Sequence, residues 1–434
     1  MRIVWLLLSF WRTRRLRFAT RVALQSYQER QLARFLPALC QRSPWFARFR
    51  GQPLSQWPLM DKALMMTHFD TINTAGLQLD QVMQAALAAE RSRDFRPVIG
   101  NVTVGLSSGT SSQRGVFAVS AKEQATWAGV MLARALPDGL FSGERVALFL
   151  RANSNLYTAV RTPWLAFSFY DLFEPFEQLL QRLANYQPSV IVAPAQVLRQ
   201  IAQAVIEGRT ILKPKRAISV AEVLEQQDRA LIVQAFGAVH EIYQASEGFL
   251  ASTCARGVLH MNEEYVHVEP HWLDQQQLRF TPIITDFSRT TQPVVRYRLD
   301  DVLVARAEPC PCGSATRTIA HIEGRCDDQL SLPGLNGVAI PLFSDMLSRA
   351  LAQILPASAD YRLIQTGPAA LALHAAVSEG QLAGIQHHLA GVLQQVGVAI
   401  DRVDWTTSTQ VPPFDPMAKR RRIVRAYQAG SVVQ

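Results

Sequence analysis

Between residues 144 and 243 the sequence alternates short apolar runs with longer amphipathic segments. The apolar runs are rich in β-branched and aromatic residues, which is typical of strands buried on both faces. Strands are predicted at 144–150, 190–193, 217–220 and 239–243, and helices at 177–186, 196–207 and 221–236. Strands connected through helices run parallel. This part of the chain therefore predicts an α/β fold, with a parallel sheet covered by helices on both faces.

The length of 434 residues predicts more than one structural unit. Residues 1–95 read as helical and are assigned to a large N-terminal α/β domain. Residues 96–325 form the core of that domain, and short extended runs at about 279–306 predict a β subdomain within it. Residues 326–434 predict a small C-terminal α+β domain, with a helix at 381–395 and a strand at 398–405.

Positive charge is concentrated at the two ends of the chain. Lys and Arg number 44 against 35 Asp and Glu, but residues 1–50 alone hold eleven Arg and a single acid, Glu29. The rest of the chain is close to neutral, which argues against a nucleic-acid-binding protein. The segment 1–17 joins an apolar stretch to a run of arginines and is too short to cross a bilayer. It reads either as a docked helix with solvated arginines or as a peripheral contact for an anionic membrane or a partner. The sequence leaves the oligomeric state open.

The five cysteines are odd in number and irregularly spaced, which favours a reducing cytoplasm over a secreted disulfide framework. Three thiols and one imidazole nevertheless match tetrahedral zinc ligation. These residues are Cys254, His260, Cys310 and Cys312. Four protein ligands leave no open position, so a zinc here would be structural. The alternative is two buried thiols and an unrelated pair.

A loop rich in glycine and hydroxyl side chains lies at residues 105–115, between two strand-like runs. Glycine lets the backbone approach a ligand closely, and exposed N–H and hydroxyl groups suit phosphate oxygens. The candidate phosphate-binding residues are Ser107, Ser108, Gly109, Thr110, Ser111 and Arg114. Composition alone more often indicates a flexible loop than a phosphate site, but the position between two strand-like runs strengthens the phosphate-site interpretation.

Polar side chains follow two strands of the predicted parallel sheet, where ligands bind in such folds. Glu222 follows the strand at 217–220, and Tyr243 ends the strand at 239–243. Ser246 and Glu247 come next. A base is able to stack on the tyrosine, a phosphate to bond the serine, and Mg²⁺ to bind the glutamate. The alternative is an ordinary turn with a helix-starting Ser/Glu pair.

Two charged clusters lie further along the chain. Asp301 closes the run Arg-Tyr-Arg-Leu-Asp-Asp, and a carboxylate at a strand end is able to accept two ribose hydroxyls. A salt-bridged turn is the alternative. Lys419 opens a cluster of five basic residues that ends at Arg425. Such a cluster is usually solvated, or it presents one lysine to an anionic transition state.

Taken in this order, these stretches resemble the adenylate-forming superfamily of acyl-CoA synthetases. The branch that they resemble is the phenylacetate-CoA-ligase-like one, which also contains a synthetase that adenylylates a deazaflavin coenzyme. The likeness runs from about Ser43 to Lys419 and rests on the stretches SSGTSSQRG, SVAEVLE, YQASEG, RYRLDD and IEGRCDD. Each stretch is a weak signal alone, and their common register makes the resemblance specific.

The resemblance implies roles for single residues of this chain. It places Ala221 and Glu222 near the purine, Asp301 at the ribose, Arg325 near the nucleotide, Asp327 as an interdomain pivot and Lys419 at the reacting groups. It also implies that the C-terminal domain is mobile, and that a structural zinc binds the three cysteines and the histidine. The sequence departs from the family pattern at several positions. Gln113 and Arg114 stand where the family's loop usually carries lysine, and Asp300 replaces a glycine. Lys419 is followed by arginines instead of glycine.

The implied reaction has two steps. A carboxylate attacks the α-phosphorus of ATP with the help of Mg²⁺, which gives an acyl-adenylate and pyrophosphate; a thiol, commonly coenzyme A, then displaces AMP. We expect the substrate to be an aromatic or otherwise apolar small carboxylic acid of a biosynthetic pathway. The aromatic run at 164–173 either lines the acid pocket or packs in the sheet core. Two alternatives remain: an adenylyltransferase that passes AMP to an acceptor hydroxyl, and a catalytically inactive scaffold with this fold.

Overall fold

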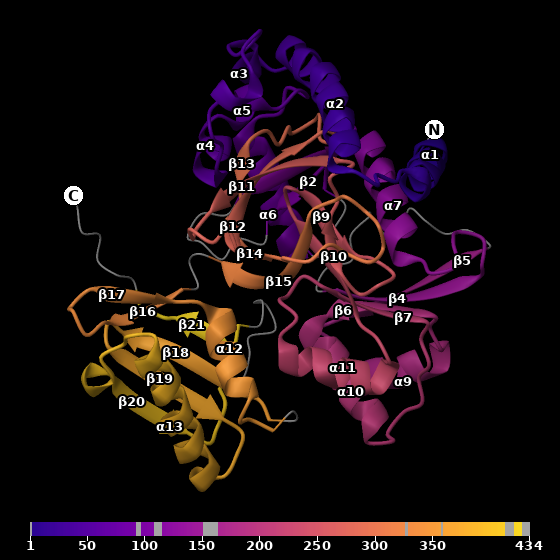
Figure 1. Cartoon of the computed structure of the whole chain (residues 1–434). Helices are drawn as coiled ribbons and strands as arrows, with labels where there is room; N and C mark the ends of the chain where they lie inside the picture. The colour runs from indigo at the N-terminus through magenta and orange to yellow at the C-terminus, as the bar shows by residue number, and fades with distance from the viewer. Residues whose placement is uncertain are drawn as a thin grey trace.

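The computed structural model describes residues 2–92, 97–107, 115–150, 164–325, 329–356, 359–412 and 421–427. Figure 1 shows a large part that carries the N-terminus and a smaller part that contains the elements from β16 (Leu330–Pro333) to β21 (Ile423–Arg425). Several predicted site residues lie outside the described residues, so the structure leaves their placement open. They are Ser108, Gly109, Thr110, Ser111, Arg114, Asp327 and Lys419.

The first described segment is helical. Its helices are α1 (Arg2–Arg15), α2 (Arg21–Arg42), α3 (Pro44–Ala47), α4 (Lys62–Thr67), α5 (Phe69–Ile72) and α6 (Leu79–Ser92), with a 3-10 turn η1 (Leu54–Gln56). A small antiparallel sheet of β1 (Val98–Ile99), β2 (Val102–Leu106) and β3 (Val116–Ser120) packs against α6. The strands β2 and β3 flank the predicted phosphate loop, which confirms that the loop connects a hairpin.

The predicted parallel sheet is present and forms half of a larger mixed sheet. Its strands are β4 (Glu144–Leu150), β5 (Leu165–Asp171), β6 (Val190–Pro194), β7 (Arg216–Val220) and β8 (His240–Ala245), in the spatial order β8-β7-β6-β4-β5. Helix α7 (Ala121–Ala135) covers one face, and α9 (Phe176–Tyr186), α10 (Ala195–Ile206) and α11 (Gln226–Phe236) cover the other. Side chains along β4 alternate between these two cores: Val146 packs with α7, whereas Phe149 packs on the opposite face.

The helix predicted at 221–236 begins five residues later, at Gln226. Ala221 has φ +66°, and the N–H of Glu222 donates to the carbonyl of Val220 at 2.8 Å. This bond closes a three-residue turn that is incompatible with a helix. The turn directs residues 221–225 along the carboxyl edge of the sheet before α11 starts.

The other half of the mixed sheet is antiparallel and corresponds to the predicted β subdomain. It contains β9 (Gly248–Thr253), β10 (Leu259–Met261), β15 (Thr318–Arg325), β14 (Asp301–Ala305), β12 (Arg279–Asp286) and β11 (Val266–Trp272), with β13 (Tyr297–Arg298) paired to β12. Its core includes residues of α2 and α3, such as Phe35 and Phe46. The helical first segment therefore packs on the β subdomain as well as on the parallel sheet.

The smaller part has its own sheets and its own core. Its strands are β16 (Leu330–Pro333), β17 (Ala339–Leu342), β18 (Tyr361–Gly367), β19 (Ala370–Ala375), β20 (Asp404–Ser408) and β21 (Ile423–Arg425), and its helices are α12 (Ser344–Ala352) and α13 (Glu379–Gln395). The predicted helix at 381–395 is present as α13. The strand predicted at 398–405 is wrong over most of its length, because residues Ile400–Arg402 form a 3-10 turn and β20 begins at Asp404.

The two parts meet at helix α11 through a buried network of charges. Arg422 of the smaller part donates to both carboxylate oxygens of Asp228 and to Glu225, at 2.6 to 3.1 Å. Arg199 donates to the same aspartate at 2.9 Å, and the hydroxyl of Tyr361 donates to Glu225 at 2.9 Å. In this arrangement the smaller part is fixed against the carboxyl edge of the parallel sheet.

Among the described residues, no helix has both the length and the apolar character needed to cross a membrane.

Candidate functional site

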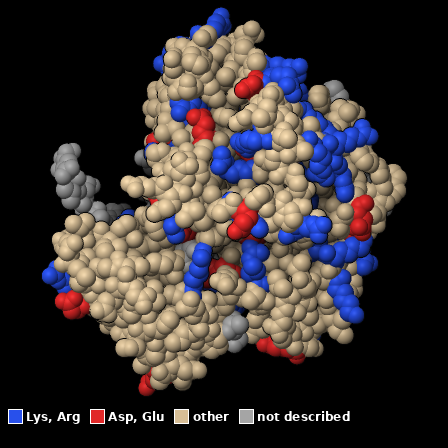
Figure 2. Space-filling model, in the orientation of Figure 1, with Lys and Arg blue, Asp and Glu red and all other residues tan. Residues whose placement is uncertain are grey.

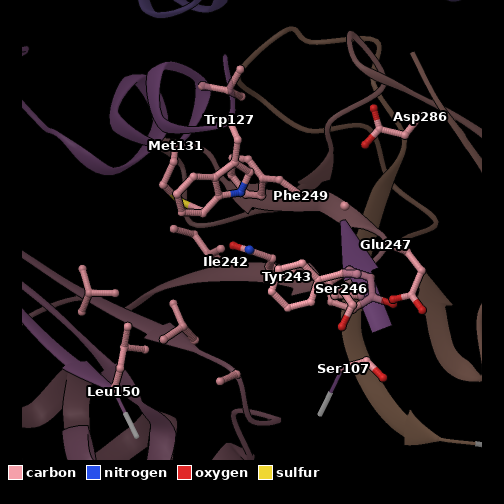
Figure 3. A pocket seen from close by; sticks show the side chains of 18 of the residues that line it. Ser107, Trp127, Met131, Leu150, Ile242, Tyr243, Ser246, Glu247, Phe249 and Asp286 are labelled. Atoms are coloured by element: carbon pink, nitrogen blue, oxygen red, sulfur yellow. The ribbon is translucent and has the colours of Figure 1, made fainter. Parts of the chain in front are cut away.

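A large cavity of about 660 Å³ lies at the carboxyl edge of the parallel sheet, between α7, the start of the antiparallel half and the end of β15. Figure 3 shows its two kinds of lining, with Tyr243, Ser246, Glu247 and Ser107 on one side and Trp127, Met131 and Phe249 on the other. The cavity therefore joins a polar end to an apolar end. The described residues that the sequence predicts at the nucleotide all line this cavity, and they are Ser107, Ala221, Glu222, Tyr243, Ser246, Glu247, Asp301 and Arg325.

Tyr243 and Asp301 are brought together from β8 and β14, which lie in different halves of the sheet. The tyrosine hydroxyl donates to the Oδ2 atom of Asp301 at 2.6 Å, and the guanidinium of Arg325 lies 3.5 Å from Oδ1. Burial and the neighbouring Asp301 carboxylate hold the pKa of Tyr243 well above its usual value, so the hydroxyl keeps its proton. All three side chains line the cavity.

Ser246 and Glu247 form the tight turn between β8 and β9 and do not start a helix. The Glu247 carboxylate accepts a hydrogen bond from the hydroxyl of Tyr297. Burial raises the pKa of Glu247, and Asp301 adds to the rise. A partly buried carboxylate of this kind is favoured in its ionised form by a bound cation, and Mg²⁺ prefers such oxygen ligands. The sequence analysis included Tyr297 in the stretch RYRLDD but gave it no role, because no local pattern links it to a carboxylate fifty residues earlier in the chain.

The γ-turn at Ala221 places Glu222 on the cavity wall. Positive φ at a non-glycine residue costs of order 1–3 kcal/mol, and such strain gathers at functional sites. The Oε2 atom of Glu222 accepts the backbone N–H of Gln196 at 3.3 Å, which ties this turn to the start of α10. The structure thus places both predicted purine-side residues on the cavity wall, held by backbone contacts from Val220 at the end of β7 and from Gln196 in the first turn of α10.

The described base of the predicted phosphate loop also borders the cavity. The ends of the loop are joined by hydrogen bonds between Ser107 and Gly115: backbone N–H to backbone O at 2.8 Å, and Gly115 N–H to Ser107 Oγ at 3.1 Å. Lys62 of α4 lies against this base, since a Cβ atom on Gly115 would be 3.0 Å from Lys62 Cε. Burial lowers the pKa of Lys62, while the nearby Glu247 carboxylate partly offsets that effect. No sequence signal linked this lysine to a loop 45 residues away.

The apolar end of the cavity lies between α7 and the face of the parallel sheet. Its walls include Met131 and Leu136 from the α7 side and Leu148, Val190 and Ile242 from the strands. From the aromatic run at 164–173, Phe167 lines this cavity, and Tyr170 is fully buried on the opposite face in a stack with Phe149. Trp164 fits neither of the two expectations for this run, because its side chain is exposed and contacts Phe141 edge to face.

Arg421 of the C-terminal basic cluster lines the cavity, and Arg422 next to it is buried in the interface with α11. These two arginines are therefore not solvated as the sequence pattern usually indicates. Arg421 lies at the cavity, and Arg422 belongs to a buried ion-pair network.

The four predicted metal ligands converge at the other end of the antiparallel half. One ligand atom from each of Cys254, His260, Cys310 and Cys312 lies within 4.8 Å of the others. The Sγ atoms of Cys254 and Cys310 are 3.7 Å apart, and Cys312 Sγ lies 3.5 Å from His260 Nε2. Tetrahedral zinc bonds of usual length require about 3.8 Å and about 3.6 Å for such pairs. The other ring nitrogen of His260 lies 2.8 Å from Thr316 Oγ1, as is common for a metal-bound histidine. The residues present fit a zinc ion.

Comparison with known proteins gives structural matches alone: no family model matches the sequence, and no curated protein matches it. The crystal structure of 2-hydroxyisobutyryl-CoA ligase in the postadenylation state with 2-HIB-AMP matches with a TM-score of 0.64 at 16% identity, over 92% of this chain and 89% of that chain. This chain has the fold of the adenylate-forming ligases. Amide bond synthetase McbA from Marinactinospora thermotolerans matches with a TM-score of 0.52 at 14% identity, over 74% of this chain and 68% of that one.

The fold class predicted from the sequence, with its large α/β part and small C-terminal part, is therefore confirmed. The same CoA ligase in its thioesterification state gives a TM-score of 0.52, lower than the 0.64 of its postadenylation state.

Proposed function

We propose that this protein is an ATP-dependent ligase that adenylates an apolar carboxylic acid and then transfers the acyl group to a thiol such as coenzyme A. The observation that carries the proposal is the continuity of one cavity between a polar end at Glu247 and Asp301 and an apolar end under α7. An acid whose apolar body lies under α7 would present its carboxylate to a nucleotide held at the polar end. Such a site works by positioning and by stabilising charge.

At the polar end, Asp301 would accept the ribose hydroxyls, and the turn at Ala221 and Glu222 would border the purine. Support comes from their shared cavity wall and from the Arg325 guanidinium beside Asp301. Ser246 and the loop residues Ser107, Ser108, Gly109, Thr110, Ser111 and Arg114 would contact phosphate oxygens. Mg²⁺, held at Glu247, would neutralise charge on the phosphates.

Lys62 is proposed to supply the lysine ammonium that the loop sequence lacks. Its side chain packs against Gly115 at the base of the loop and lies close enough to Glu247 for that carboxylate to affect its pKa. The ammonium is thus placed between the loop and the proposed Mg²⁺ ligand, where β- and γ-phosphate oxygens would lie. A lysine acting as a point charge on phosphate is a common arrangement.

From the smaller part, Lys419 is proposed to approach the reacting carboxylate, with Asp327 as the pivot of a mobile domain. The support is the position of Arg421, two residues later, at the cavity wall. The zinc site is proposed to be structural, because four protein ligands close its coordination sphere. It would join the loop after β9 to the loop before β15 and so support the sheet that carries Asp301.

The proposal is tested by pyrophosphate release from ATP with a panel of linear and aromatic acids of increasing size. We expect release with apolar acids, AMP formation that depends on coenzyme A, and an acyl-CoA product in the mass spectrum. Glu247→Gln should lower the rate about 10²-fold or more by weakening Mg²⁺ binding. Glu308→Gln is the matched control, since that carboxylate is 80% exposed and outside the cavity.

Three results would contradict the proposal or part of it. Absence of pyrophosphate release with every acid would favour an inactive scaffold. AMP attached to an acceptor hydroxyl would indicate an adenylyltransferase. An acyl product with amines and none with thiols would leave the adenylation step intact and overturn the thiol acceptor.

A further inference from the structure

Helix α1 is fixed to the body of the protein through one face. Leu6 and Phe10 are buried against α7, and a Cβ atom at Gly129 of α7 would lie 2.3 Å from the carbonyl oxygen of Leu6. Only glycine allows this close approach of the two helices. Thr13, on the same face, bonds to the hydroxyl of Tyr265 at 2.7 Å. The orientation of α1 is therefore set, and its opposite face points away from the protein.

That outward face is apolar, which is unusual for a surface helix. Val4, Leu8 and Trp11 follow the spacing of a single helical stripe, and their side chains are 56%, 57% and 44% exposed. Ile3 and Trp5 border the stripe and are exposed as well. Five large apolar side chains on one outer surface form a patch of the kind that marks a binding site.

The surroundings of this patch are strongly basic. No acidic residue occurs before Glu29, and Arg2, Arg15 and Arg17 are exposed at the two ends of the helix. The ammonium of Lys122 lies 4.2 Å from the centre of the Trp5 ring. Figure 2 shows Lys and Arg side chains gathered over α1 and along the side of the molecule below it. The partner that this surface fits is apolar in its interior and anionic at its boundary.

A second aromatic cluster extends the patch beyond the C-terminal end of α1. The guanidinium of Arg14 lies 3.4 Å from the Cβ position of Gly139, and two residues later Phe141 contacts Trp164 edge to face at 5.3 Å. These two rings are about half exposed. Tryptophan, phenylalanine and arginine together are the residues that lie at the boundary between lipid headgroups and acyl chains.

We propose that α1 docks this protein on the surface of an anionic lipid bilayer. The helix is 14 residues long and would lie in the plane of the interface, because about 21 Å of helix is shorter than the bilayer core. Val4, Leu8 and Trp11 insert among the acyl chains, while Arg2, Arg15 and the neighbouring cations contact phosphate groups. The protein body stays in water, since the opposite face of α1 is occupied by α7. The proposal is independent of the ligase activity.

The test is flotation of the full chain with vesicles of phosphatidylcholine alone or mixed with phosphatidylglycerol. We expect binding to the mixed vesicles, much weaker binding to the neutral ones, and release at high salt. Leu8→Ser with Trp11→Ser should lower the partition about tenfold or more. Arg15→Glu with Arg17→Glu should lower it by at least about fivefold for each charge removed. All four side chains are exposed, so the variants should keep the wild-type circular dichroism spectrum.

The matched control is Leu335→Ser with Val338→Ser, which removes two apolar side chains that are even more exposed, from the turn between β16 and β17. This control should bind vesicles like the wild type. The proposal is overturned if the wild type ignores the mixed vesicles, if the control loses as much binding as the α1 variant, or if neutral vesicles bind equally well. A dimer that Leu8→Ser with Trp11→Ser converts to a monomer, without vesicle binding, would assign the patch to a second copy of the chain instead.

Discussion

Replacing Arg422 by methionine should weaken the contact between the two parts of the protein without unfolding either of them. The Arg422 side chain is 2% exposed, and its main partner Asp228 is 4% exposed. Burial alone would raise the pKa of Asp228, but Arg422 and Arg199 reverse that effect and lower it. Methionine keeps most of the side-chain length and removes the charge and the hydrogen bonds.

Breaking a buried ion pair by removing one partner costs about 3–5 kcal/mol. Asp228 keeps its bond to Arg199, so the lower end, about 3 kcal/mol, is expected here. The smaller part has its own core of leucines, including Leu347 and Leu373, and should remain folded. The lost free energy therefore weakens the contact between the two parts and not the folding of either part. The equilibrium between docked and separated arrangements should shift by roughly 150-fold toward the separated one.

Hydrogen-exchange mass spectrometry measures this shift directly. The interface segments to follow are 352–362, where the carbonyls of Pro356 and Ala359 accept bonds from Gln227 and Arg199, and 225–232 of α11. Exchange should become faster in both segments and stay unchanged in β19 and α13. Arg402→Met, an exposed arginine of the same part, is the control and should have no effect. Equal exchange in wild type and Arg422→Met would refute the view that this network holds the interface.

Three further predictions concern single sites. Lys62→Met should reduce kcat/KM for adenylation about 10²-fold in a pyrophosphate-release assay. Lys213 is an exposed lysine, and Lys213→Met should leave kcat/KM unchanged. Equal activity of the two variants would show that Lys62 has no role in adenylation. Metal analysis should find about one zinc per chain. The zinc should be lost in Cys312→Ser and kept in Cys40→Ala, because Cys40 lies outside the cluster. Retention of zinc in Cys312→Ser would contradict the proposed ligand set. Burial, with help from Arg216, lowers the pKa of His240 to about 4. In the unfolded chain His240 takes up a proton near pH 6.5, whereas in the folded protein it stays neutral down to about pH 4. The free energy of unfolding is therefore highest above pH 6.5 and decreases as the pH falls toward 4. Urea unfolding should show a loss of about 2 kcal/mol between pH 7 and pH 5 that His240→Gln lacks, and identical losses in both proteins would refute the assignment.

The sequence alone determined the features that depend on local periodicity or on a short run of residues. Apolar runs between amphipathic segments fixed β4, β6, β7 and β8, because a strand buried on both faces tolerates little else. The turn after β8 and the Cys-x-Cys-Gly pair were also visible, since their chemistry sits within a few neighbouring residues. Boundaries were less well determined: α11 starts after a strained turn at Ala221, and no periodicity encodes a positive φ at alanine.

Tertiary structure decided which distant residues meet. Lys62 reaches the base of the predicted phosphate loop only because α4 packs beside β3, and Tyr297 reaches Glu247 only through the antiparallel half of the sheet. Trp164 and Phe167 are three residues apart in one aromatic run, yet one is exposed at the sheet edge and the other lines the cavity. Arg421 and Arg422 are adjacent in sequence and face a cavity and a buried interface. The members of each pair are alike in chemistry, both aromatic or both arginine. The neighbours that distinguish them come from segments far away in the chain, about which the local pattern carries no information.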